Sequence, residues 1–317
     1  MAFSLDDRHI VITYHYIRDP DPAFSGIHSC PVKEFEKQLS FLKENFEVTT
    51  IPEVFRAARE ADPLKMCAIT FDDGLKDNYK NAIPVLQKYR TTATFFPITS
   101  TFSGVFPVTH KIHILLSRLE VKELIDLYNT YIKKFFSSNT DEYYIPKDRR
   151  LTTLRKVWDD ILTANFKEMM NILPVKIRND FLTHMFFELK LDEKELVDDF
   201  FMSSYQVREL AGDGFYIGSH GHTHDAFDRL PSEGVAHEII ESKKILTDIT
   251  QKPVTLLSYP QGGSNRDVIR YLQQEGFTHA VTTEKRGINN KDSEFSIPRY
   301  DTNNIRDFLN NEEGRHF

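Results

Sequence analysis

The clearest indication of the fold in this chain is the run Met66-Cys67-Ala68-Ile69-Thr70-Phe71-Asp72-Asp73-Gly74. Six mostly apolar residues are followed directly by two carboxylates and a glycine, which is typical of a buried strand that ends in a polar turn. Further short apolar runs are separated by helical patterns and cover residues 9–14, 48–51, 92–96, 215–218, 255–259 and 279–282. Strands and helices in alternation predict a parallel sheet with crossover helices, as in α/β folds.

The alternation stops between residues 109 and 201. Apolar residues there recur at the spacing of helices, and strand patterns are almost absent. We interpret this segment as a helical insertion into one barrel, which would then consist of residues 1–108 and 202–317. The single tryptophan, Trp158, lies in the insertion. We expect it to pack between helices.

The composition is that of a folded protein, and its charge argues against two kinds of partner. Of the 317 residues, 40% are hydrophobic and 27% are charged, so enough apolar surface exists to build a core. The net charge is −7, from 40 basic and 47 acidic residues. An acidic chain suits neither nucleic acid, which is bound by neutralising phosphates, nor an anionic membrane surface.

Cysteine usage and hydropathy give an expectation about the compartment. The chain has two cysteines, Cys30 and Cys67, so no disulfide framework is expected, and two thiols suit a reducing environment. The first residues lack the pattern of a secretory signal, and no run of 18 apolar residues predicts a membrane span. We therefore expect a cytoplasmic protein without an integral membrane segment.

Polar residues follow four of the predicted strands. The carboxyl ends of parallel strands meet at one edge of the sheet, where the active sites of such folds lie. The residues at these ends are His15, the pair Asp72 and Asp73, the histidine-rich run 220–224 and the run 259–262. The sequence therefore predicts that these four groups converge on one active site.

His220 and His224 are candidates for metal binding. Their i, i+4 spacing can place both imidazoles on one side of a turn, and a carboxylate from another strand end would complete a set of two histidines and one acid. A solvated histidine-rich turn is the alternative, but the nearby Asp-Asp-Gly favours metal ligation.

Asp72 and Asp73 also have a structural alternative, since Asp-Asp-Gly is a common turn and Asp a common helix cap. Neighbouring residues that leave a strand point in different directions, however. One carboxylate can therefore bind a metal while the other acts as a general base on water.

These residues resemble the motifs of the polysaccharide deacetylases, a family that includes chitin, chitooligosaccharide and peptidoglycan deacetylases. Thr70-Phe71-Asp72-Asp73-Gly74 is similar to the first motif of the family, and His220-x-x-x-His224 is similar to the second. The resemblance covers about residues 10–102 and 202–300. It implies a distorted (β/α) barrel, interrupted here by the helical insertion.

The resemblance also implies roles for individual residues. Asp72 would be the general base that activates water to attack an acetamide carbonyl. Tyr259 and Gln261, on either side of Pro260, would contribute to substrate and oxyanion binding, Gln261 through its backbone N–H. The implied cofactor is a divalent metal, usually zinc and sometimes cobalt, nickel or iron, held by Asp73, His220 and His224.

The sequence departs from the family in two motifs. Ser258-Tyr259-Pro260-Gln261 stands where many relatives have Arg-x-Pro-Tyr, so the arginine that orients the base is missing there. Arg299 is our candidate substitute, with a surface arginine as the alternative. The family's Leu-x-His, which supplies the general acid, has no counterpart. His15 is our candidate for this role, because Tyr14-His15 is similar to the Tyr-His of relatives that process poly-N-acetylglucosamine; a structural histidine is the alternative.

We therefore expect a metal-dependent carbohydrate N-deacetylase that acts on an N-acetylated sugar or oligosaccharide. A cytoplasmic location would suit a nucleotide- or lipid-linked substrate. One alternative is an amidohydrolase for a non-sugar linear or cyclic amide. Another is a degenerate, non-catalytic glycan-binding module, but such a module need not retain both a base and a set of metal ligands.

Overall fold

The computed structural model describes residues 2–136, 142–151 and 159–313, so Trp158 lies outside the described residues. The chain divides into two compact units. The barrel unit is formed by Met1–Asp19, Ser29–Pro107 and Val197–Phe317, and the helical unit by Pro20–His28 and Val108–Leu196. The helical unit therefore also includes a segment near the N-terminus that lies outside the insertion expected from the sequence.

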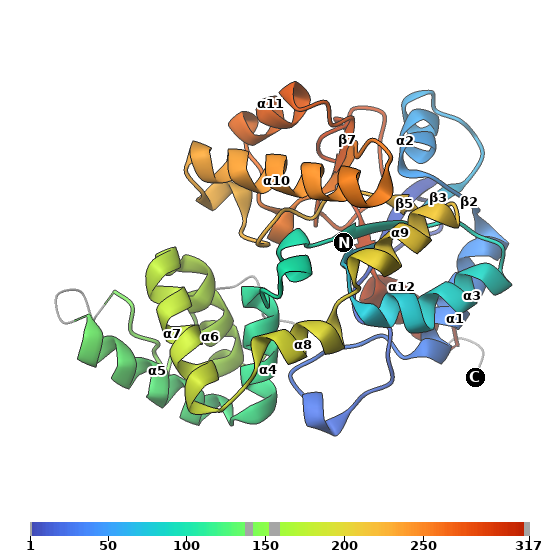
Figure 1. The fold of residues 1–317 in the computed structure, drawn as a ribbon. Coiled ribbons are helices and arrows are strands. Elements are labelled where there is room, and N and C mark those ends of the chain that lie inside the picture. Colours follow the sequence, from blue (N-terminus) through green and yellow to red (C-terminus); the bar gives the residue numbers. More distant parts are fainter. Residues whose placement is uncertain (1, 137–141, 152–158, 314–317) are drawn as a thin grey trace. The chain divides into compact units, whose positions relative to one another are not determined.

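The barrel unit contains two parallel sheets (Figure 1). One has the order β5-β4-β3-β1-β8, with β2 beside the start of β3, and the other consists of β6 and β7. The strands are β1 (His9–Tyr14), β2 (Glu47–Thr49), β3 (Met66–Asp73), β4 (Thr94–Pro97), β5 (Tyr216–Ile217), β6 (Leu256–Ser258), β7 (His279–Val281) and β8 (Tyr300–Asp301). The predicted α/β class with a parallel sheet is confirmed.

Two single bridges join these sheets into a closed barrel. Ser219, just after β5, pairs with Leu257 in β6, and Ile297, just before β8, pairs with Val281 in β7. The larger sheet runs from β5 to β8, where β8 pairs with β1. The two bridges connect its two edges through β6 and β7, so the strands form a closed ring. Single bridges in place of continuous ladders make the barrel irregular. The expected distorted (β/α) barrel is thus confirmed.

Alternate strand residues pack on opposite faces of the barrel wall, as the period of two of a strand requires. One cluster joins the apolar face of α2 (Ile51–Arg59) to the strand residues Val11, Ala68, Phe96, Leu256, Val281 and Ile297. Their neighbours in sequence pack instead against the surrounding helices, among them Ile10, Ile12, Cys67, Ile69, Phe95 and Leu257. The first set therefore fills the inside of the barrel and the second covers its outside.

The helices fall into the same two units. Those of the barrel unit are α1 (Val32–Asn45), α2, α3 (Ile83–Lys88), α9 (Ser204–Gly212), α10 (Ser232–Thr250), α11 (Arg266–Gln274) and α12 (Thr302–Glu313). Those of the helical unit are α4 (Val108–Arg118), α5 (Val121–Phe135), α6 (Ile161–Ile172) and α7 (Val175–Glu188), and they pack side by side in Figure 1. Helix α8 (Glu193–Phe200) begins in the helical unit and ends in the barrel unit.

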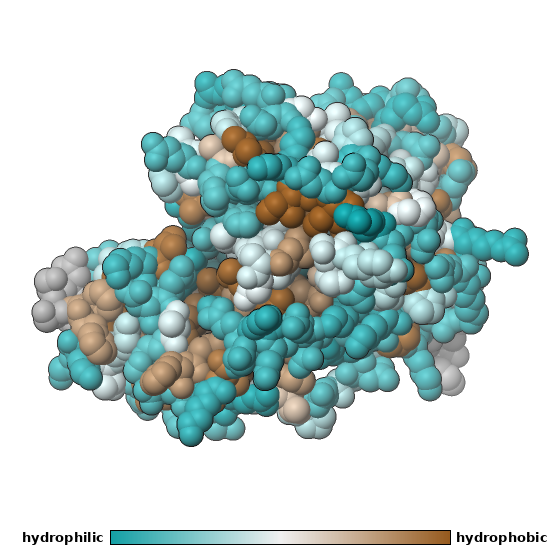
Figure 2. Space-filling model, viewed as in Figure 1, coloured by the Kyte–Doolittle hydropathy of each residue, from teal (hydrophilic) through white to brown (hydrophobic). Residues whose placement is uncertain are grey.

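The face in Figure 2 is largely hydrophilic and is interrupted by smaller hydrophobic areas. None of the described helices combines the length and the apolar character that crossing a bilayer requires.

Candidate active site

Asp72 and Asp73 lie at the carboxyl end of β3, where the chain turns sharply. Asp72 continues the inward-facing series of Ala68 and Thr70, as the alternation of the strand requires. Asp73 and Gly74 then both have positive φ angles, of 71° and 73°. A Cβ on Gly74 would lie 2.6 Å from the Cβ of Pro97, so only glycine fits this turn. The turn sends the two carboxylates in different directions.

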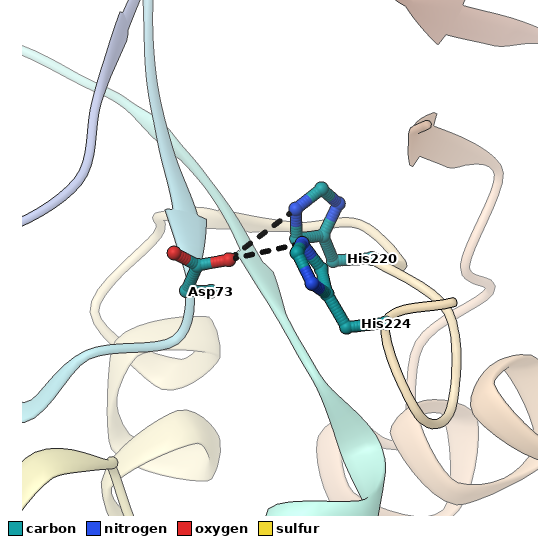
Figure 3. Close-up of side chains that lie close together, drawn as sticks. All are labelled: Asp73, His220 and His224. Carbon is teal, nitrogen blue, oxygen red and sulfur yellow. Dashed lines mark ion pairs between the residues drawn. The ribbon is translucent and has the colours of Figure 1, made fainter. Parts of the chain in front are cut away.

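The structure brings Asp73, His220 and His224 together, although Asp73 comes from β3 and the histidines from the loop after β5 (Figure 3). Asp73 Oδ1 lies 3.4 Å from His220 Nε2 and 3.5 Å from His224 Nε2. All three side chains are buried, and their ligand atoms lie within 4.8 Å of one another. Among the described residues this is the one group of three or more such side chains that could hold a metal ion.

The chemistry of these donors fits a divalent cation. Two ligand atoms about 2.1 Å from one tetrahedral ion are about 3.4 Å apart, close to the observed separations. His220 Nδ1 lies 2.8 Å from the Ser258 carbonyl oxygen. Because a carbonyl can only accept, we assign the imidazole proton to Nδ1, which leaves the Nε2 lone pair facing Asp73.

Asp72 forms a buried, two-pronged ion pair with Arg299. Arg299 Nη1 donates to Asp72 Oδ1 at 2.9 Å and Nη2 donates to Oδ2 at 2.8 Å. Arg299 is only 2% exposed, so the alternative of a surface arginine is wrong. Asp72 Oδ2 lies 4.0 Å from His220 Nε2, which puts this carboxylate beside the candidate metal ligands.

The inside of the barrel holds the Arg299 guanidinium in place. It donates further hydrogen bonds of 2.9 to 3.1 Å to the side-chain oxygens of Thr13, Thr70 and Ser258 and to the carbonyl oxygen of Thr282. Ser258 Oγ in turn donates to Asp72 Oδ2 at 3.1 Å. A guanidinium with this many partners in fixed positions has one orientation, and so has the carboxylate that it binds.

Electrostatics keep Asp72 ionised. Burial by itself would raise the pKa of Asp72, but the Arg299 guanidinium and the charges of His220 and His15 hold this pKa well below its ordinary value. For His220, burial lowers the pKa, whereas the carboxylates of Asp72 and Asp73 raise it, and the result is a pKa above the ordinary value.

His15 and Gln261 lie at two other strand ends. His15 directly follows β1, is exposed, and is close enough to Asp72 for its charge to affect the pKa of that carboxyl. Gln261 is exposed and has a φ of 56°. Seven described non-glycine residues have positive φ, and Asp73, His224 and Gln261 are three of them. Strained backbone of this kind is common at functional sites.

The expected substrate contact of Tyr259 needs correction. Its ring is 1% exposed and packs in the outer core, and its hydroxyl donates to the Phe295 carbonyl oxygen at 3.0 Å. Leu256 faces inward and Leu257 outward, so the strand alternation turns Ser258 inward and Tyr259 outward. The side chain that β6 directs toward Asp72 is therefore that of Ser258.

The sequence reasoning also missed Thr13 and Thr70, which bind Arg299 from inside the barrel. A signal for them existed. Each is a polar residue inside an apolar strand, and Thr70 stands two positions before Asp72, on the same face. Polar residues at buried positions of a strand need a partner, and here that partner is one arginine.

The sequence model of the family described as polysaccharide deacetylase matches residues 59–123 and 157–280, which is well over half of the chain. The chain belongs to the polysaccharide deacetylase family. The matched ranges contain Asp72, Asp73, His220 and His224, and they also include parts of the helical unit.

Individual relatives are distant, and each match covers only part of the relative. The chain is 23% identical over 257 residues to YxkH of Bacillus subtilis, whose name gives it as a candidate polysaccharide deacetylase; the match covers 80% of this chain and 58% of the relative. It is 27% identical over 154 residues to the poly-β-1,6-N-acetyl-D-glucosamine N-deacetylase of Staphylococcus epidermidis, covering 44% of this chain and 51% of the relative. The chain thus spans little more than half the length of these relatives.

A solved structure has the same fold. The Streptococcus pyogenes deacetylase PplD, determined in complex with acetate, superimposes with a TM-score of 0.58 at 16% identity, over 94% of this chain and 96% of the other. At this level of identity the likeness concerns the barrel fold alone.

Proposed function

We propose that this chain is a metal-dependent carbohydrate N-deacetylase that hydrolyses the acetamide group of an N-acetylated sugar. The observation that carries the proposal is the position of Asp72. This buried carboxylate, paired with Arg299, lies beside the Asp73–His220–His224 group at one end of the barrel. Hydrolysis of an unactivated amide needs a positioned base next to an electrophilic site, and this arrangement supplies both.

In the proposed reaction, water adds to the acetyl carbonyl carbon, the C–N bond breaks, and acetate and a free amine are released. A divalent ion bound by Asp73, His220 and His224 would supply Lewis acidity and lower the pKa of nearby water. That effect matters here because an aspartate with a depressed pKa is a weak base for ordinary water. We propose zinc as the ion, since a set of two histidines and one carboxylate is a common zinc site.

Other residues of the site would transfer protons or stabilise the negative charge that develops on the carbonyl oxygen. Asp72 would accept the proton of the attacking water, while Arg299 fixes the orientation of its carboxylate. The backbone N–H of Gln261 would donate to the carbonyl oxygen as negative charge builds on it. His15 would give a proton to the amine nitrogen as the C–N bond breaks.

For the substrate we propose an N-acetylglucosamine unit in a glycan or a glycan precursor. The names of the relatives support an N-acetylated polysaccharide. A nucleotide- or lipid-linked sugar is the further proposal, and it goes with our expectation of a cytoplasmic location. Cys30 and Cys67 are buried free thiols, which suits a reducing compartment. Cell fractionation tests that location.

Acetate release tests the proposed activity. Zinc-loaded protein would be offered N-acetylglucosamine as the free sugar, as a nucleotide-linked sugar, as a lipid-linked sugar and as a β-1,6-linked oligomer. We expect release from at least one of these, abolished by a chelator and lowered by about 10²- to 10⁴-fold in Asp72→Asn, which loses the base. Release that a chelator does not affect, or no release from any of the four by a metal-loaded protein, would contradict the proposal.

A further inference from the structure

Helix α10 carries a buried carboxylate that none of the steps above uses. Glu238 is 3% exposed and lies on the same side of the helix as the buried residues Val235 and Ser242. Acidic residues at such positions are rare unless other groups satisfy their oxygens. The partners of Glu238 all lie in the loop that contains the candidate metal ligands.

Both oxygens of Glu238 bind the segment between His220 and His224. Oε2 accepts from the backbone N–H groups of His222 at 2.7 Å and Thr223 at 2.9 Å. Oε1 accepts from the Thr223 hydroxyl at 2.6 Å and from the same N–H at 3.1 Å. One carboxylate thus fixes two consecutive peptide units, and in all four of these hydrogen bonds its oxygens are the acceptors.

The same helix holds the start of the loop one turn further on. Ser242 Oγ lies 2.7 Å from Ser219 Oγ, and Ser219 Oγ accepts from the N–H of Gly221 at 3.1 Å. Ser242 also donates to the carbonyl oxygen of Ile239, so we assign Ser219 as the donor between the two hydroxyls. Helix α10 therefore contacts the loop at two points, through Ser242 and Glu238.

The loop needs this support because its backbone is strained. His224 has a φ of 72°, a left-handed conformation that residues with a side chain rarely adopt, and Gly221 has a φ of 76°. A Cβ on Gly221 would lie 2.8 Å from Glu238 Oε2. Glycine at 221 therefore serves two purposes, since it permits the turn and leaves room for the carboxylate.

We propose that Glu238 is a positioning residue for the metal ligands. By holding residues 222 and 223, it keeps His220 and His224 converging on Asp73 Oδ1 and offsets the strain at His224 before any ion binds. This inference rests on the proposed function in one respect, which is that Asp73, His220 and His224 bind a divalent ion. It does not depend on which amide the chain hydrolyses.

The test is the zinc affinity of Glu238→Gln. Glutamine keeps the shape of the side chain but replaces one acceptor oxygen with an N–H₂ group, which cannot accept from the backbone. We expect the zinc Kd, measured by competition with a chromogenic chelator, to rise about 10- to 100-fold, as for other partners of metal ligands. Glu233→Gln, at an exposed position of the same helix, is the control and should stay within about twofold of the wild type.

One further measurement and one further variant distinguish a positioning role of Glu238 from a general loss of structure. Excess zinc should restore most of the acetate release of Glu238→Gln, because the proposed catalytic groups are unchanged. Should this variant not fold, Thr223→Val removes only the hydroxyl partner of Oε1 and should weaken zinc binding in the same direction, by less.

The outcomes distinguish the two proposals. An unchanged Kd in Glu238→Gln, or an equal rise in Glu233→Gln, would overturn the role of Glu238. A raised Kd in a protein that releases no acetate from any substrate would support the role of Glu238 and contradict the deacetylase. A wild type that binds no zinc, cobalt, nickel or iron would overturn both.

Discussion

The two sides of the candidate active site are built in different ways. The base side lies inside the barrel, with Asp72 in β3 and Arg299 directly before β8, and the position of Asp72 follows from strand register and alternation. The metal side lies on turns, where Asp73 and His224 both have left-handed backbone conformations. Glu238 holds the histidine loop of this side from a helix outside the barrel wall. Strands thus orient one side, and turns with external hydrogen bonds orient the other.

Because the two sides are built differently, substitutions on each side should have different effects. A change on the base side should lower the stability of the fold, because it leaves a charge unpaired in the barrel interior. A change on the metal side should lower metal affinity while the barrel remains folded. Substitutions at Asp73, Arg299 and His15 test this contrast.

The largest effect is expected for Asp73→Asn. Asparagine tolerates positive φ, so the turn should persist, but the neutral amide is a poor ligand for a divalent ion. Several kcal/mol of transition-state stabilisation would be lost, which corresponds to about 10³-fold or more in the rate of acetate release. Metal content, acetate release and urea unfolding would be measured. Full metal content in this variant would contradict the assignment of Asp73, and a large loss of stability would contradict the contrast itself.

Arg299→Met should act on stability. It leaves the buried Asp72 carboxylate without its partner, at an expected cost of about 3–5 kcal/mol in the free energy of unfolding. Asp72→Leu combined with Arg299→Met should recover much of this loss, because no unpaired charge then remains. Arg270→Met is the control, since the Arg270–Asp267 pair is exposed and should contribute only about 0–1 kcal/mol. Equal effects of the two single variants would show that the barrel interior does not depend on the Arg299 pair.

The Asp72–Arg299 ion pair should also make the stability of the fold depend on pH. The pKa of Asp72 in the folded chain lies below the value of about 3.9 that it has when unfolded. The pair therefore stabilises the fold above about pH 4, and this contribution is lost as the pH falls below that value. In Arg299→Met, burial is no longer opposed by the guanidinium, so the pKa of Asp72 should rise above its unfolded value. Protonation of the buried carboxylate would then relieve the cost of its charge, so the difference in stability between this variant and the wild type should narrow as the pH falls from 7 to 4. Urea unfolding at pH 7, 5 and 4 checks the difference.

The smallest of the three effects is expected for His15→Ala. His15 is exposed at the end of β1 and belongs to neither the ion pair nor the metal group. Loss of a general acid should lower kcat by about 10²-fold, with metal content and unfolding free energy nearly unchanged. A variant that loses its metal but keeps its residual rate would rule out the acid role. An unchanged kcat would do the same.

Much of the fold was predictable because its signals are local. Apolar runs of strand length alternate with helical patterns, and the break in this alternation between residues 109 and 201 predicts a helical insertion. The contribution of Pro20–His28 to the helical unit was not predictable, since a short polar segment carries no periodicity that assigns it to a unit. The inward position of Ser258 and the outward position of Tyr259 follow from a register that the short run 255–259 leaves open.

The family, the barrel and the residues at the strand ends could be predicted from sequence alone, because the motifs around Asp72 and His220 are contiguous and follow apolar strands. The polar residues that support these motifs became clear only from the folded chain. Arg299 lies 227 positions from Asp72 in the chain, and Glu238 looks like any acid on an amphipathic helix. The physical reason is that a pattern in sequence reports which face of an element a side chain occupies. Which groups meet across that face depends on how the barrel closes and on how α10 packs against the loop that carries His220 and His224.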